Sequence, residues 1–244
     1  MSGLIVPKWP APANVRACST TRTGGVSQAA WSSLNLGGHV GDDPAAVATN
    51  RQRLVELAQL PAMPHWLEQV HGTEVARLSA TQQQNILRAD GAITREPGVV
   101  CAVMTADCLP VLFCSADGTE VAAAHAGWRG LCGGVLESVL QQFRCKPQDI
   151  HAWLGPAIGP NAFEVGGEVR NAFLAQDAQA EEAFRPSGKK YYADIWLLAR
   201  QRLLAAGLYS ISAEPRCTFS ENDDFFSFRR DGTTGRMATL IWLI

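Results

Sequence analysis

The sequence lacks an excess of either charge, and it lacks a long apolar segment. The formal net charge is -2 at pH 7 and 18% of the residues are charged, whereas nucleic acids and anionic membranes attract basic surfaces. No run approaches the ~18 apolar residues of a membrane span, and residues 1–12 lack the apolar core of a signal peptide. We therefore expect a cytoplasmic protein with no nucleic-acid or membrane partner, and no protein partner is visible in the sequence.

Cysteines and histidines are few and do not form short metal-binding pairs. The seven cysteines include no C-x-x-C pair, which favours reduced thiols, some of them available for a metal or for catalysis. The five histidines are His39, His65, His71, His125 and His151, and no H-x-H pair occurs. A multicopper laccase holds a mononuclear copper and a trinuclear cluster, which together need more imidazoles than this chain has. The histidine count therefore disfavours a multicopper laccase.

The chain also lacks internal repeats, low-complexity tracts and linkers, so we expect a single domain, 1–244. Apolar runs predict strands and amphipathic segments predict helices, but the two do not alternate in the strict βαβ rhythm of a doubly wound sheet. We expect a mixed α/β fold in which helices cover a buried sheet. The expected strands lie within 99–114 (broken at 105–107), 121–124, 152–154 and 238–244; the expected helices are 43–60, 133–143, 167–175 and 194–206.

Three separate segments carry the residues best suited to bind a metal. They contain His71, Cys108 and His125, each beside small residues at the end of an apolar run. Two imidazoles and one thiolate suit zinc or copper, and three protein ligands leave a fourth position open for catalysis. Each residue alone has a structural alternative, because a cysteine after an apolar run is often a small buried side chain. The spacing matches no short metal-binding motif.

Eight motifs lie along almost the whole chain: CSTTRTGGVS (18–27), LNL (34–36), EQVHG (68–72), DGA (90–92), TADCLP (105–110), HAGWRG (125–130), LGPAIGP (154–160) and FSFRRD (226–231). Together they resemble the motifs of the YfiH/laccase-domain family. The resemblance implies that His71, Cys108 and His125 are zinc ligands and catalytic residues, with Zn²⁺ as the cofactor and Cu²⁺ as a possible substitute. It also implies a layered α/β/β/α fold, distantly like the catalytic domain of cytotoxic necrotizing factor.

The same resemblance implies several reactions. The first is zinc-dependent phosphorolysis of purine nucleosides (inosine, adenosine, guanosine and methylthioadenosine), with adenosine deaminase activity beside it. The first alternative is a cytosolic amidase that edits misincorporated residues on peptidoglycan precursors, and the second is a copper-dependent polyphenol oxidase. We expect the nucleoside reaction, and hence a small-molecule substrate with phosphate.

Phosphorolysis requires side chains that hold a phosphate anion. Arg22 with Gly24 is a candidate anion loop, because glycine lets backbone N–H groups approach an oxyanion. Arg51 and Arg129 are candidates for a bidentate phosphate clamp. Asn35 could bind a ribose hydroxyl or cap a turn.

Three further features near these motifs have two interpretations each. Asp107 could orient His71 or His125, or accept a proton, although neighbouring residues of a straight strand point to opposite faces. Trp128 could stack on a purine or pack structurally. Residues 225–228 could line the same pocket or pack the last strand.

The metal hypothesis predicts the behaviour of one variant. Cys108→Ala removes the only thiolate among the candidate ligands, so we expect loss of bound metal and of turnover with the fold retained. Metal analysis and circular dichroism of the purified variant test this. A Cys108→Ala protein that keeps its activity would contradict the assignment.

Overall fold

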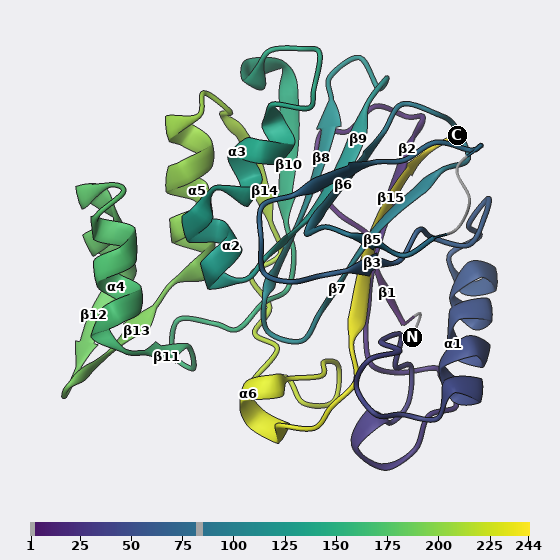
Figure 1. Ribbon diagram of the computed structural model, residues 1–244, viewed down its shortest axis with the longest axis horizontal. Helices are drawn as coiled ribbons and strands as arrows, with labels where there is room; N and C mark the ends of the chain where they lie inside the picture. The colour runs from purple at the N-terminus through teal and green to yellow at the C-terminus, as the bar shows by residue number, and fades with distance from the viewer. Residues whose placement is uncertain (1–2, 82–84) are drawn as a thin grey trace.

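The computed structural model describes residues 3–81 and 85–244. Figure 1 shows the arrangement of its elements. The helices are α1 (Pro44–Leu57), α2 (Trp128–Gly133), α3 (Val135–Leu140), α4 (Gly167–Leu174), α5 (Ile195–Ala205) and α6 (Phe228–Asp231). The strands are β1 (Leu4–Ile5), β2 (Val15–Thr20), β3 (Leu67–Glu68), β4 (Val75–Arg77), β5 (Leu87–Arg88), β6 (Gly91–Thr94), β7 (Val100–Thr105), β8 (Leu109–Ser115), β9 (Val121–Ala126), β10 (Ile150–Leu154), β11 (Glu164–Val165), β12 (Phe184–Ser187), β13 (Lys190–Ala193), β14 (Ser210–Ala213) and β15 (Met237–Leu243).

Two sheets pack face to face, and helices cover the outside of each. One sheet has the strand order β1-β2-β15-β7 and the other has the order β14-β10-β8-β9-β6-β4. Helix α1 lies on one side of the pair, and α2, α3 and α5 lie on the other (Figure 1). The small sheet β11-β13-β12 lies with α4 at the outer edge of that second side. The arrangement confirms the predicted α/β/β/α layering.

Three apolar layers fill the interior: one between the two sheets, and one between each sheet and the helices that cover it. The alternation of side chains along the strands explains them. In β8, Phe113 faces α3 and α5 while Leu112 faces the other sheet. In β15, Ile241 packs between the sheets and Leu240 packs in the cluster that includes Leu54 of α1. Successive strand residues point to opposite faces, so runs that are apolar at every position can fill two layers at once.

One predicted helix is shorter than expected. The expected helix 133–143 corresponds to α3, and the short helix α2, which was not predicted, precedes it; Gly134, whose φ of +101° is left-handed, separates the two. Glycine tolerates this conformation and ends the first helix. Helix α1 begins as expected after Asp43, whose side chain accepts a hydrogen bond from the backbone N–H of Ala45. In the described part of the chain, no helix combines the length and apolar character needed to cross a membrane.

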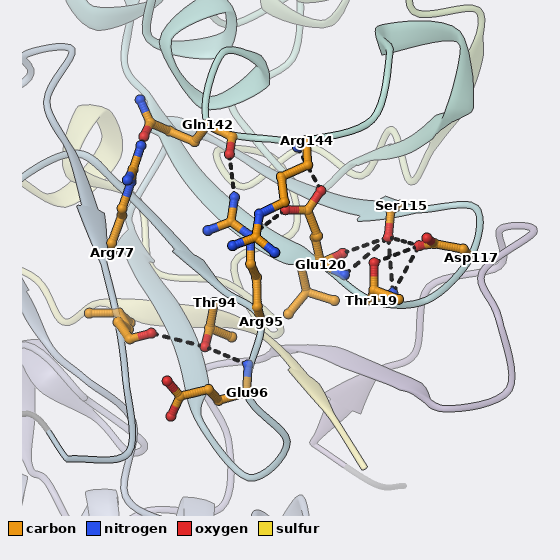
Figure 2. Close-up of polar contacts among 12 residues, drawn as sticks. Arg77, Thr94, Arg95, Glu96, Ser115, Asp117, Thr119, Glu120, Gln142 and Arg144 are labelled. Atoms are coloured by element: carbon orange, nitrogen blue, oxygen red, sulfur yellow. Dashed lines mark hydrogen bonds and ion pairs between the residues drawn. The ribbon is translucent and has the colours of Figure 1, made fainter.

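The β8–β9 hairpin brings two of the candidate ligands to one end of the larger sheet. Pro110 pairs with His125 in the antiparallel register, so Cys108, just before β8, lies near His125 on the neighbouring strand. Polar contacts close the opposite end of the hairpin, where the Ser115 hydroxyl donates to Asp117 at 2.6 Å (Figure 2). Arg95 also pairs there with the buried carboxylate of Glu120. The register of the hairpin is thus fixed at the end remote from the candidate ligands.

Removal of a core side chain should destabilise this scaffold. Phe113 is completely buried, so Phe113→Ala should lower the free energy of unfolding by about 3–5 kcal/mol. Urea denaturation measures the change. Tyr209 is 70% exposed, and Tyr209→Ala, as the control, should change the same quantity by less than about 0.5 kcal/mol. Equal effects of the two substitutions would contradict the packing described here.

Candidate metal centre

His71, Cys108 and His125 converge at the end of the β8–β9 hairpin. Their ligand atoms all lie within 4.8 Å of one another. The Nε2 atom of His71 lies 3.8 Å from the Cys108 sulfur, and the two imidazole rings meet edge to face with centroids 4.8 Å apart. His125 is buried whereas His71 is exposed, so the cluster is open on the His71 side. The three predicted ligands therefore come together from distant parts of the sequence.

Asp90 holds two of these ligands in place. One of its oxygens lies 2.7 Å from Nδ1 of His125, and the carboxylate also accepts hydrogen bonds from the backbone N–H groups of Val70, His71 and Gly72. A proton on Nδ1 leaves Nε2 of His125 as the atom available to a metal. Burial opposes the charge of Asp90, but the hydrogen bonds from His125, Gly72 and Val70 outweigh it and lower the pKa of the carboxyl group.

The backbone around His71 is unusual and is braced on both sides. His71 has a φ of +60°, a left-handed conformation that costs free energy in a residue with a side chain. The Gln69 amide accepts from the N–H of Met104 and donates to its carbonyl, both at 2.7 Å, which fixes the loop to β7. A Cβ atom added to Gly127 would lie 2.6 Å from Cδ2 of His71 and 3.0 Å from the Cys108 sulfur. Only glycine leaves room for these two side chains.

The electrostatics favour a thiolate on Cys108 paired with a protonated His125. Burial alone would raise the pKa of the Cys108 thiol. The charge of His125 and hydrogen bonds to both histidines outweigh burial, so the pKa of the thiol is lowered. Burial lowers the pKa of His125, yet the Cys108 thiolate and Asp90 raise it overall. A thiolate is the form that binds zinc, and a bound cation would take the place of the proton shared by this pair.

The donor set and its spacing fit a zinc ion. Tetrahedral zinc with Zn–S of about 2.3 Å and Zn–N of about 2.0–2.1 Å places sulfur and nitrogen about 3.6 Å apart, close to the 3.8 Å between Cys108 and His71. Within residues 3–81 and 85–244, this is the one group of three or more His, Cys, Asp or Glu side chains that could hold a metal ion. Two imidazoles and a thiolate also accommodate copper, so the geometry does not select the metal.

Two cavities meet at this cluster and share Ala106, Cys108, Arg129 and Phe228. The basic pocket, of about 350 Å³, is lined by the three candidate ligands together with His39, Gln69, Arg236 and neighbouring residues of β7. The aromatic pocket, of about 270 Å³, is lined by Trp128, Phe163, Ile158, Ile195, Asp107 and Arg229. The cluster therefore lies at the junction between a cationic compartment and an aromatic one.

Several predicted residues line these cavities, though not always in the predicted role. Arg129 borders both cavities, and its guanidinium lies 4.5 Å from the centre of the Trp128 ring. The prediction that Asp107 orients His71 or His125 is wrong: its carboxylate accepts from Thr218 Oγ1 and from the backbone N–H of Arg229. Its φ of +96° turns the chain between β7 and β8, and Asp90 takes the orienting role.

Four other predicted substrate-binding residues do not line either cavity. Arg22 donates to the carbonyls of Ser32 and Asn222 and lies 4.7 Å from the Phe226 ring centre, and Gly24 forms a turn with φ +97° nearby. Arg51 donates twice to the Leu36 carbonyl. Asn35 is completely buried and its amide is hydrogen-bonded on both sides, so a ribose hydroxyl cannot reach it.

The sequence did not identify His39 and Arg236, which line the basic pocket, and it gave Phe228 two possible roles. His39 follows a glycine pair, and Arg236 lies just before the last strand, so neither belongs to a recognisable binding pattern. Phe228 is 57% exposed at the mouth of both cavities, while Phe225 and Phe226 are buried in a small apolar cluster. Residues 225–228 therefore serve both of the roles considered for them.

Comparison with known proteins finds one matching family model, two close relatives and one similar crystal structure. Residues 16–244 match a family model described as multi-copper polyphenol oxidoreductase laccase. The chain is 61% identical over 244 residues, and over 100% of both chains, to a protein of Escherichia coli (strain K12) named purine nucleoside phosphorylase YfiH. It is 54% identical to a Pseudomonas aeruginosa protein named as a purine nucleoside phosphorylase, covering 100% of this chain and 99% of the other. A crystal structure of a Neisseria meningitidis protein superposes with a TM-score of 0.94 at 49% identity and covers 99% of each chain.

The contacts of Asp90 predict a large effect on metal affinity. Asp90→Asn places N–H donors where His125 and three backbone amides donate, so we expect zinc affinity to fall about 10–100-fold. Competition with a chromophoric chelator measures the affinity. Asp117→Asn is the matched control, because this exposed carboxylate accepts similar hydrogen bonds at the far end of the hairpin. Unchanged zinc affinity in Asp90→Asn would show that Asp90 does not orient the ligands.

Proposed function

The chain belongs to the family described as multi-copper polyphenol oxidoreductase laccase, and from that premise we propose that it is a zinc-dependent purine nucleoside phosphorylase. The observation that carries the proposal is the junction of an aromatic pocket with a basic pocket at His71, Cys108 and His125. The names of two close relatives support the same activity. The free thiols of all seven cysteines fit the cytoplasmic location expected from the sequence.

The family description and the names of the relatives point to different chemistry, and the residues favour the relatives. A multicopper oxidase needs several clusters of imidazoles. Of the histidines in the described chain, only His71 and His125 belong to a group that could hold a metal. His151 instead lies 2.7 Å from the Ser210 hydroxyl in the β10–β14 pair. A single three-ligand centre is suited to polar catalysis on a small molecule rather than to multicopper oxidation.

The aromatic pocket suits a purine base. Trp128 and Phe163 offer ring faces, and Ile158 and Ile195 complete an apolar wall. Asp107 and the backbone of Arg229, joined by a 2.7 Å hydrogen bond, add polar groups at the same wall. Stacking with a few fixed polar contacts is a common way to bind a heteroaromatic ligand. A base held there would direct its ribose toward the junction at Cys108.

In the proposed reaction, a phosphate oxygen forms a bond to C1′ of the ribose as the bond from C1′ to N9 of the purine breaks. The purine leaves with the electron pair of that bond, and the proton lost by hydrogen phosphate balances the proton that the purine takes up. The products are ribose 1-phosphate and the free base. Inosine, guanosine, adenosine and methylthioadenosine all carry the bond that this reaction cleaves.

His71, Cys108 and His125 would hold the zinc ion. When bound, zinc supplies a Lewis acid at the junction of the two pockets. Asp90 keeps His125 in the tautomer that leaves Nε2 free, and the exposed side of His71 leaves access for substrate. We further propose adenosine deaminase activity, in which water replaces the 6-amino group and ammonia leaves, because zinc centres with an open position commonly support this reaction on purines.

An amidase acting on peptidoglycan precursors is the second candidate. The observation in its favour is the closeness of the Cys108 thiol to His71 and His125, an arrangement typical of thiol nucleophiles with a histidine base. A thiolate that binds zinc is not free to attack an amide. Metal loading should therefore suppress a thiol amidase and should be required by the phosphorylase.

Product analysis distinguishes the candidates. Zinc-loaded protein with inosine should release hypoxanthine and ribose 1-phosphate only when phosphate is present, and adenosine should also give inosine and ammonia. Chromatography of the products, with chelator-treated protein as the control, measures both reactions. Cleavage of a muramyl-serine precursor without any turnover of nucleosides would reject the phosphorylase and favour the amidase.

A further inference from the structure

Of the residues predicted to bind phosphate, only Arg129 lines the basic pocket. Its lining contains Arg129, Arg236 and His39 but no aspartate or glutamate. The described residues show eight acid–base ion pairs, and neither Arg129 nor Arg236 belongs to one. Two arginines that face a common cavity without a carboxylate repel each other. A bound anion would relieve that repulsion.

Arg236 is held in position by contacts that leave most of its guanidinium free. Its backbone N–H donates to the buried Asn35 side chain at 2.9 Å, and its aliphatic stem lies over Gly37, where an added Cβ would approach Cγ to 2.8 Å. Its NH1 group donates to the carbonyls of Thr234 and Gly235. Nε and NH2 of Arg236 have no hydrogen-bond partner among the described residues. The side of the guanidinium that carries these two nitrogens can therefore bind an anion in a bidentate manner.

Arg129 approaches the same cavity from the other side. It follows Gly127 and Trp128 at the start of α2, and its guanidinium is stacked on the Trp128 ring at 4.5 Å. No side-chain hydrogen bond from Arg129 is formed within the described chain. Stacking restricts the guanidinium without using its N–H donors. Arg129 also borders the aromatic pocket, so it lies between the places proposed for the base and for the anion.

We propose that Arg236 and Arg129 form the subsite for the phosphate co-substrate in the basic pocket, beside His71, Cys108 and His125, with His39 at its rim. The assignment rests on the proposed phosphorylase function and deepens it. It transfers the phosphate role from Arg22 and Arg51, which do not line the basic pocket and which use Nε and one further nitrogen each to donate to backbone carbonyls. The pocket lies against Cys108, so a phosphate there would approach a nucleoside whose base occupies the aromatic pocket.

The test compares Arg236→Gln and Arg129→Gln with wild-type protein at equal zinc content. The phosphate KM for inosine phosphorolysis should rise at least about tenfold in each variant, since loss of a charge-assisted hydrogen bond commonly has an effect of this size. The inosine KM should change less than about threefold. Arg236→Lys should recover part of the phosphate affinity, because it restores the charge without the two-pronged geometry.

Arg22→Gln is the matched control. Arg22 resembles Arg236 in donating to two carbonyls and in lying over a phenylalanine ring, but it does not line the basic pocket. Its phosphate KM should equal that of wild type. Arg129 is exposed, so Arg129→Gln keeps the test valid even if Arg236→Gln folds poorly.

A direct binding measurement separates this proposal from the proposed function. Titration of inorganic phosphate, followed by phosphorus NMR with and without inosine, reports the subsite without turnover. Weakened phosphate binding in both variants supports the subsite even if no nucleoside is cleaved. Phosphorolysis with unchanged phosphate KM in both variants overturns the subsite while the function stands. Absence of phosphate binding to wild-type protein under both conditions also overturns it.

Discussion

The carboxylate of Asp90 is the constraint on which the candidate centre depends. Its side chain accepts from the ring of His125 and from three successive backbone amides around His71. Its own carbonyl accepts from the N–H of His125 at 2.7 Å. One buried residue therefore positions a ligand on β9 and the loop that carries a second ligand. The carboxylate satisfies those three amides, and the hydrogen bonds offset the free-energy cost of the left-handed backbone at His71.

The rest of the architecture brings separate segments to this carboxylate. The β6–β9 register pairs Gly91 with Ala124 and so places Asp90 beside His125. The β8–β9 register adds Cys108, and Gly127 leaves the space in which His71 and Cys108 meet. The segments around the cluster then line two different pockets. Trp128 of α2 and Phe163 line the aromatic pocket, and Arg236, just before β15, lines the basic pocket. Rigid sheet ends and short loops thus define both the arrangement of the three candidate ligands and the separation of the two pockets.

The sequence predicted the layered fold and the three candidate ligands to different degrees. Apolar runs such as 99–114 located β7 and β8, and the motifs around His71, Cys108 and His125 identified the ligands through family resemblance rather than through spacing. The apolar pattern predicted a helix from residue 133, but the left-handed backbone at Gly134 delays its start to Val135, and the short helix α2 before it was not predicted. Asp90 stood in a quoted motif, but its role depends on strand register, which the motif does not encode. Nothing in the sequence distinguishes Arg22 from Arg236; the structure shows that Arg236 lines the basic pocket and that Arg22 does not.

X-ray absorption at the zinc edge of the metal-loaded protein is the most direct test of the centre that unites these features. The account predicts one sulfur at about 2.3 Å and two imidazole nitrogens at about 2.0–2.1 Å, together with a lighter ligand at the open position. The sulfur contribution should vanish in Cys108→Ser, while the imidazole contribution remains. A wild-type spectrum without sulfur, or with more than one sulfur, would contradict a centre built from His71, Cys108 and His125.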